Sequence, residues 1–174
     1  AVPGLAFVYL GNWVLNIPSQ GSANLAAALG SPYQLKINEW LAAPASGADW
    51  FELYNPNAQP VELSGLHLTD DLNNRLQYAP FPPRSYIAAG LSGFLKMVAD
   101  NDTAAGADHV PFALSRSGES LGISDRFGTL IDQITFTGQI TGVSQGRLPD
   151  GSTNITFFGE TQSRVVITCK PLDA

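Results

Sequence analysis

Short runs of alternating apolar and polar residues follow one another along most of the chain, from Tyr33 to Phe158. Alternation with a period of two is typical of strands that bury one face and expose the other. Pairs of turn residues separate the runs, among them Asn55-Pro56, Ser64-Gly65, Ser117-Gly118 and Phe127-Gly128. These turns, and the lack of long amphipathic helical patterns, predict an all-β fold in which two antiparallel sheets form a sandwich.

The first two runs of the series also predict which side chains share a face. Strict alternation in the first run places Ile37 and Glu39 on one face of a strand and Trp40 on the other. In the second run, Phe51 and Leu53 are expected on the same face. Under this interpretation, Trp40 lies on the opposite side of its sheet from Ile37.

Residues 1–32 precede the series and have a different pattern. The apolar runs Leu5–Leu10 and Trp13–Ile17 flank Gly11-Asn12, which favours a hairpin. The link that follows is rich in small residues, and one helical turn is predicted at Asn24–Leu29. We therefore expect three parts: an N-terminal extension packed on the sandwich (1–32), the sandwich itself (33–160), and a C-terminal tail or last strand (161–174).

The composition narrows the range of partners. Fifteen acidic against nine basic residues give a net charge of −6, and the basic residues are scattered. A negative field repels phosphate backbones, so we expect no nucleic-acid partner. Cys169 is the single cysteine, which excludes an internal disulfide and a cysteine zinc cluster. No stretch approaches the ~20 consecutive apolar residues that a membrane-spanning helix needs, so no transmembrane segment is predicted.

Five motifs occur in a fixed order along the chain: INEW (Ile37–Trp40), DWFELYNP (Asp49–Pro56), VELSGLHLTDD (Val61–Asp71), FALSRSGESLGISDRFGTLIDQITF (Phe112–Phe136) and QGRLPDG (Gln145–Gly151). In this order they resemble the lamin tail domain. The resemblance implies an immunoglobulin-like antiparallel β-sandwich of the lamin-tail type, with an added N-terminal hairpin or extension and no catalytic activity. Bacterial domains of this kind are attached to exported or cell-surface proteins. The resemblance therefore implies a secreted or surface-bound interaction and tethering module with a protein or cell-envelope partner.

Three charged residues are expected to have structural roles. Glu39 and Glu52 lie on neighbouring predicted strands, and a glycosidase would need two such carboxylates as an acid/base pair. Because both match acidic positions of the lamin-tail pattern, we expect them to form hydrogen bonds to turn amides or to an arginine instead. Arg147 is expected to bridge a carboxylate bidentately, with Glu52 and Asp150 as the candidates, since a planar guanidinium suits that geometry.

The loop ADNDTAAGADH supplies a candidate calcium site from four side chains: Asp100, Asn101, Asp102 and Asp108. Calcium takes several oxygen ligands, but the spacing here does not match an EF-hand loop. Capping of turn amides by these side chains is therefore the favoured interpretation. The two histidines, His67 and His109, are far apart in the sequence and have no cysteine near them. No bound metal and no cofactor is predicted.

A second functional hypothesis is a carbohydrate- or calcium-dependent binding module attached to a secreted hydrolase. Its sugar platform would consist of aromatic side chains, although such side chains in sandwiches more often fill the core: Trp40, Trp50, Tyr54 and Phe81. An enzyme is not predicted, because the serines around Gly118 form no GxSxG elbow on a strand-to-helix turn and the sequence has no phosphate-binding glycine loop. Open sheet edges also permit strand addition, and a weak homodimer through the N-terminal hairpin is a further hypothesis.

Overall fold

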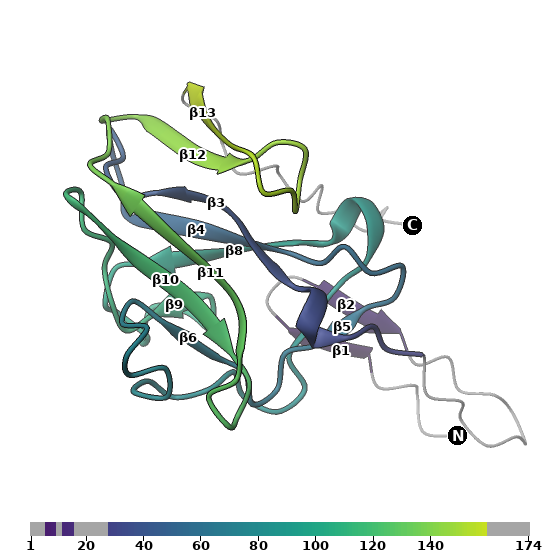
Figure 1. Cartoon of the computed structure of the whole chain (residues 1–174). Helices are drawn as coiled ribbons and strands as arrows, with labels where there is room; N and C mark the ends of the chain where they lie inside the picture. Colours follow the sequence, from purple (N-terminus) through teal and green to yellow (C-terminus); the bar gives the residue numbers. More distant parts are fainter. Residues whose placement is uncertain (1–5, 10–11, 16–27, 160–174) are drawn as a thin grey trace, which may run out of the picture.

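Two β-sheets face each other and enclose the apolar interior in the computed structural model of the chain, which describes residues 6–9, 12–15 and 28–159 (Figure 1). The larger sheet has six strands in the order β13 (Ile155–Gly159), β12 (Val143–Arg147), β3 (Lys36–Leu41), β4 (Asp49–Tyr54), β8 (Phe94–Ala99) and β9 (His109–Val110). The smaller sheet has the order β11 (Leu130–Thr137), β10 (Gly118–Ser124) and β6 (His67–Thr69). The predicted immunoglobulin-like β-sandwich is confirmed.

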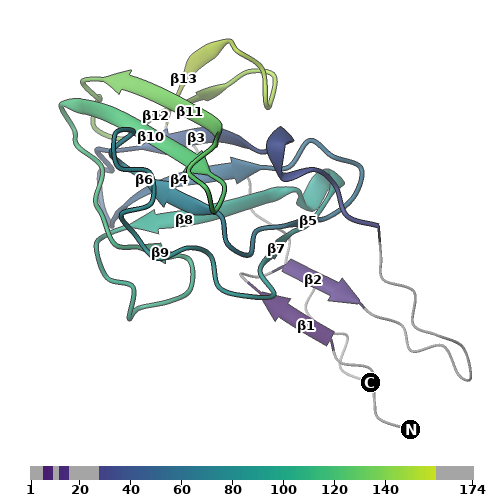
Figure 2. The same cartoon turned by 60° about the horizontal axis from the view of Figure 1, so that its bottom comes forward.

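Two short strand pairs lie beside the sandwich. Strand β5 (Val61–Glu62) pairs with β7 (Tyr86–Ile87), and β1 (Ala6–Tyr9) pairs antiparallel with β2 (Asn12–Leu15). The second pair is the hairpin expected near the N-terminus. Figure 2 shows this hairpin next to the β5–β7 pair, and β2 contacts β7.

Helical structure is limited to two 3-10 turns in the described ranges, η1 (Pro32–Gln34) and η2 (Gly90–Ser92). No helix in these ranges is long and apolar enough to cross a membrane. Of the helical turn predicted at Asn24–Leu29, residues 24–27 lie outside the described residues, and Leu29 is not helical. The predicted tail or last strand at 161–174 also lies outside them.

The core is a single apolar cluster between the two sheets. Both sheets contribute to it, mainly through Leu35, Ile37, Trp40, Phe51, Leu53, Met97, Leu121, Ile123, Ile134 and Phe136. Aromatic contacts join the sheets, since the ring centroids of Trp40 and Phe136 are 5.9 Å apart. Phe51 and Leu53 both lie in the cluster, so the predicted alternation in β4 is correct.

The alternation predicted for β3 is wrong, because the strand contains a β-bulge. Ile37 is paired with Leu53 and Glu39 with Glu52, which leaves Asn38 as an extra residue. An extra residue shifts the side chains that follow it to the other face. Trp40 therefore points into the core together with Ile37, and its exposed fraction is 1%.

Gly146 on β12 allows the neighbouring strand to approach this bulge. It is the residue opposite Glu39, and a Cβ atom at this position would lie 2.7 Å from the carbonyl oxygen of Asn38. It would also lie 3.1 Å from the Cα atom of Glu39. Because both of these are backbone atoms, no side-chain rotation relieves the overlap.

Gly146→Ala is therefore expected to lower the free energy of unfolding by about 1–3 kcal/mol, the usual cost of overpacking. Gly138→Ala is the matched control, since a Cβ there meets nothing within 4 Å. Urea unfolding of both variants measures the difference. Equal midpoints for the two variants would show that β12 can move away from the bulge without cost.

Candidate functional site

An apolar groove of about 340 Å³ lies between two segments that are distant in the sequence. Buried core residues form its floor: Leu68 from β6, Met97 from β8 and Val110 from β9. The segment from Tyr78 to Pro82 forms one wall, and residues between Thr103 and Pro111 form the other. The volume is at the lower end of the ~300–1,000 Å³ typical of ligand pockets.

The first wall is an extended segment that Phe81 fixes to the chain before it. The N–H of Phe81 donates to the carbonyl of Leu66 at 2.8 Å, and the carbonyl of Phe81 accepts from Gly65 at 2.9 Å. Phe81 itself is buried, whereas Pro80 and Pro82 on either side are exposed. Since proline has no N–H to donate, this wall presents ring carbons rather than backbone donors.

Tyr78 joins the first wall to the core. Its ring lies 5.4 Å from that of Phe112, and its carbonyl is hydrogen-bonded to Nδ1 of His67 at 2.9 Å. His67 thus supports the wall from behind, in contrast to the other histidine, His109, which lines the groove.

The second wall is the loop that was the candidate calcium site. Asp100 holds His109 through a 2.8 Å contact between Oδ2 and Nδ1, and its Oδ1 accepts the N–H of Asp102 at 3.0 Å. Asp102 in turn accepts the N–H of Ala104 at 3.1 Å. Asn101 has a φ of 61°, a left-handed conformation that asparagine tolerates in turns. Asp100 and Asp102 thus cap the loop's own amides, as expected.

Asp108, the fourth residue of the candidate calcium site, holds the loop against β8 through its backbone. Its carbonyl accepts the N–H of Val98 at 2.8 Å. Across the described ranges, no three His, Cys, Asp or Glu side chains are arranged to hold a metal ion.

The first wall lies in a negative electrostatic environment. Burial raises the pKa of Tyr78, and the negative charge of the nearby Asp70 raises it further. Burial also raises the pKa of Glu119, although a hydrogen bond from the N–H of Ser115 opposes the shift. The charges of Asp70 and Asp49 add to the increase at Glu119. Several carboxylates are therefore close enough to act on one another beside Tyr78.

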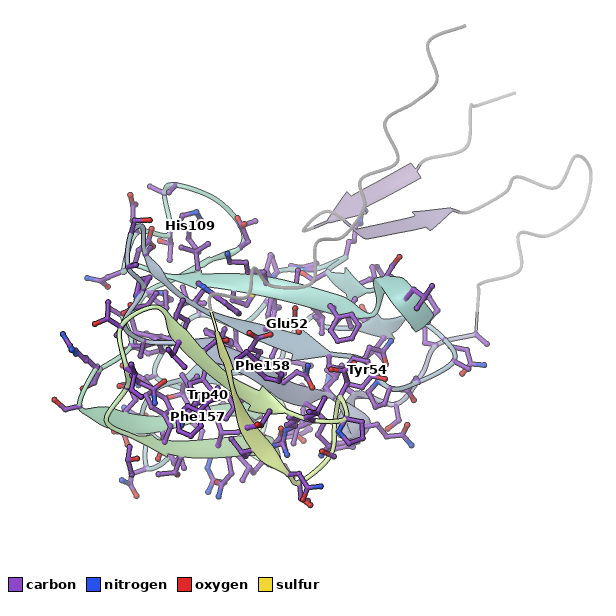
Figure 3. The ribbon with its side chains drawn as sticks, turned by 90° about the horizontal axis from the view of Figure 1, so that it is seen from above. Trp40, Glu52, Tyr54, His109, Phe157 and Phe158 are labelled. Carbon is purple, nitrogen blue, oxygen red and sulfur yellow. The ribbon has the colours of Figure 1, made fainter. Side chains whose placement is uncertain are left out.

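Glu39 and Glu52 lie in the six-stranded sheet, away from the groove. They are directly opposite each other on β3 and β4, and both are buried. Glu39 accepts a hydrogen bond from Ser144 at 2.6 Å, and Glu52 accepts one from Asn38 at 3.3 Å. Figure 3 shows Glu52 within the sheet and His109 at its edge, where His109 begins β9. These contacts are structural hydrogen bonds, from a serine hydroxyl to Glu39 and from an amide side chain to Glu52.

Arg147 forms an ion pair with Asp132, so both partners proposed from the sequence were wrong. Its Nη2 lies 3.1 Å from Oδ2 of Asp132, Nε donates to the carbonyl of Ile37 at 2.8 Å, and Nη1 donates to that of Ser152 at 2.6 Å. Gly146 is paired with Glu39, so the next residue, Arg147, points to the other face of the sheet, towards β11. The guanidinium therefore joins the two sheets through three separate groups and not through a bidentate fork.

The aromatic platform suggested for sugars is not a surface feature. Trp40, Trp50 and Phe81 have exposed fractions of 1%, 6% and 7%. Tyr54 is half-buried and stacks on Phe94 with a centroid distance of 4.7 Å. The four side chains thus pack against the protein itself.

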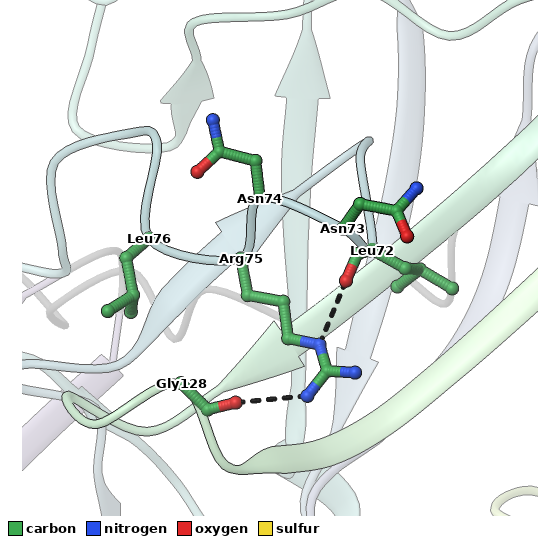
Figure 4. A pocket seen from close by; sticks show the side chains of 6 residues that line it. All are labelled: Leu72, Asn73, Asn74, Arg75, Leu76 and Gly128. Atoms are coloured by element: carbon green, nitrogen blue, oxygen red, sulfur yellow. Dashed lines mark hydrogen bonds between the residues drawn. The ribbon is translucent and has the colours of Figure 1, made fainter.

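A second and more open hollow lies beside residues 72–76 and Gly128 (Figure 4). Arg75 crosses it, with Nε donating to the carbonyl of Leu72 at 3.0 Å and Nη1 to that of Gly128 at 3.1 Å. These bonds fasten the loop to the turn between β10 and β11, so Arg75 has a structural role there.

Comparison with known proteins gives one match. The family model described as Lamin Tail Domain matches residues 30–138, which is 109 of the 174 residues. No curated protein and no solved structure matches the chain. The matched range includes both walls of the groove and ends before β12.

Arg147→Lys is expected to lower the free energy of unfolding by roughly 1.5–3 kcal/mol, the usual contribution of a hydrogen bond to a charged group. A compact ammonium group cannot reach the three separate acceptors that the guanidinium of Arg147 binds. Arg116→Lys, on an exposed turn, is the control and is expected to leave it nearly unchanged. Thermal and urea unfolding measure both. Equal stabilities would mean that the contacts of Arg147 do not hold the sheets together.

Glu119→Gln is expected to change how stability depends on pH. The raised pKa means that the folded state binds this proton more tightly than the unfolded state. Its stabilisation is present below the unfolded pKa and is lost as the pH rises through the folded pKa. The stability of Glu119→Gln relative to wild type should therefore increase from acidic to neutral pH. Urea unfolding across that range measures it, with the exposed Glu62→Gln as the charge control. A constant difference would contradict the assignment.

Proposed function

Because the chain belongs to the lamin tail domain family, an immunoglobulin-like and non-catalytic domain family, we propose that it is a non-catalytic interaction module that holds its partner in the apolar groove. The groove lies within the part of the chain that matches the family. The partner is a protein or a component of the cell envelope. By analogy with the bacterial domains that its motifs resemble, the module tethers an exported or cell-surface protein.

The observation that carries this proposal is an apolar groove whose floor is the core itself. Leu68, Met97 and Val110 are held in three different strands, so the floor has a fixed shape before any partner arrives. The walls are also fixed, by the backbone bonds of Phe81 and by the Asp100–His109 contact. A preformed apolar surface binds with less ordering cost than a flexible one.

The chemistry of the groove supports binding rather than catalysis. His109 with Asp100 has the form of a base and its orienting carboxylate. A nucleophilic mechanism also needs an activated nucleophile within hydrogen-bonding reach of the base. The described residues that line the groove include no serine or cysteine, and neither of their hydroxyl groups, on Tyr78 and Thr103, is hydrogen-bonded to His109. The Asp100–His109 contact thus serves to fix the loop.

Filling the groove is the direct test. Ala107 is exposed and lines the groove, so Ala107→Trp places a large ring there without removing a core contact. Peptides selected from a random displayed library on the wild-type protein should bind Ala107→Trp at least about tenfold more weakly.

The control is Ala58→Trp, which adds the same ring to an exposed turn after β4. It should bind the selected peptides as the wild type does, and thermal unfolding should show both variants folded. A library that yields no peptide sensitive to Ala107→Trp contradicts the proposed function.

A further inference from the structure

The floor and walls of the groove are suited to hold a large apolar side chain of a partner. The lining is mainly hydrocarbon, and Met97 on the floor can adapt its shape to an inserted group. The volume of about 340 Å³ is small for a ligand site, which suits a single bulky anchor better than a wide surface. Anchors of this kind contribute most of the binding energy of many protein interfaces.

Carboxylates stand on both sides of this apolar lining. The charge of Asp70 acts on Tyr78 of the first wall, its Oδ1 accepts a hydrogen bond from Gln77 at 3.0 Å, and Asp71 follows it in the chain. On the second wall, Asp100 contacts His109, while Asp102 precedes the lining residue Thr103. Asp71 and Asp102 are exposed. An acidic rim around an apolar floor favours a cationic partner and speeds its approach.

Four basic side chains in the described part of the chain have contacts away from the groove. Lys36 and Arg147 both bind Asp132, and Arg75 donates to the two carbonyls described above. Lys96 lies over the ring of Trp50 at 4.8 Å.

Three arginines of that part of the chain remain. Arg126 lies over the ring of Phe127, and Arg84 and Arg116 are exposed on turns. None of the three is among the described residues that line the groove. Among the described residues that line the groove, no lysine or arginine neutralises the carboxylates at its rim.

We propose that the occupant of the groove is a basic peptide segment, in which a large apolar side chain enters the groove and flanking lysine or arginine residues face the carboxylates of Asp70 and Asp102. This inference rests on the proposed function and names the class of partner. The same short segment must then make two kinds of contact, an apolar one in the groove and an ionic one at the rim.

Three synthetic peptides with a fluorescent label test the two contacts separately: Lys-Lys-Ser-Trp-Ser-Lys-Lys, its counterpart with Glu for every Lys, and its counterpart with Ala for Trp. Fluorescence anisotropy with the whole chain measures binding. The first peptide should bind at least about tenfold more tightly than either of the others, and more weakly as salt is raised, because salt screens ionic contacts.

Variants of the protein locate the contacts. Ala107→Trp should abolish binding of the first peptide, and Ala58→Trp should not. Asp70→Asn and Asp102→Asn should each weaken binding by about threefold to fivefold, the effect of one charge pair near a surface. Both substitutions keep an oxygen that can accept the local hydrogen bonds. Glu62→Gln removes one exposed charge from β5 and should have no effect.

The outcomes separate the inference from the function on which it rests. If the Glu peptide binds as tightly as the Lys peptide and remains sensitive to Ala107→Trp, the groove binds a partner and the proposed charge preference is wrong. If the Ala peptide binds as tightly as the Trp peptide, the apolar anchor is wrong. If no Trp-containing peptide binds in a way that Ala107→Trp removes, the inference fails. The library selection then decides separately whether the groove is a binding site.

Discussion

One extra residue in β3 determines how the two sheets fit together. Without the bulge at Asn38, the large ring of Trp40 would face away from the core that Ile37 enters. The bulge brings Trp40 inward while the Asn38 side chain stays on the outer face, where its amide donates to the carboxylates of Glu52 and Asp150. The same irregularity thus fills the interior and fastens the turn after β12. A regular strand with this sequence could do only one of these.

The groove inherits its rigidity from that interior. Its floor residues are members of the core cluster, so the floor cannot move without disturbing the contact between the sheets. The walls come from two loops, but each loop is held at a fixed point: Phe81 by two backbone bonds and His109 by Asp100. A surface in which only exposed side chains can adjust suits the proposed role, because it can select a partner better than it can follow a partner's shape.

The period-two pattern and the ordered motifs were sufficient to predict the sandwich and the inward face of β4. They failed at Trp40 because alternation assumes a regular strand, and nothing in INEW marks the bulge. The partner of Arg147 had a usable signal, since Asp132 has the same parity on β11 as the buried Ile134 and Phe136. A carboxylate on a core-facing position needs a cation there. The sequence contains no comparable sign of the groove, because its two walls are distant in the chain and only the pairing of strands brings them together.

The acidic loops at the surface follow from the small number of basic residues in the chain. With nine basic residues in the chain, those that hold the sheets and loops together leave few to balance the acidic loops. Asp132 forms ion pairs with both Lys36 and Arg147. Two cations thus neutralise one carboxylate between the sheets and are not available to the acidic loops at the surface. A buried carboxylate without a cation would destabilise the fold far more than an exposed one. The structural demand of the core thus leaves the rim of the groove acidic, and the proposed preference for a basic partner rests on this acidity.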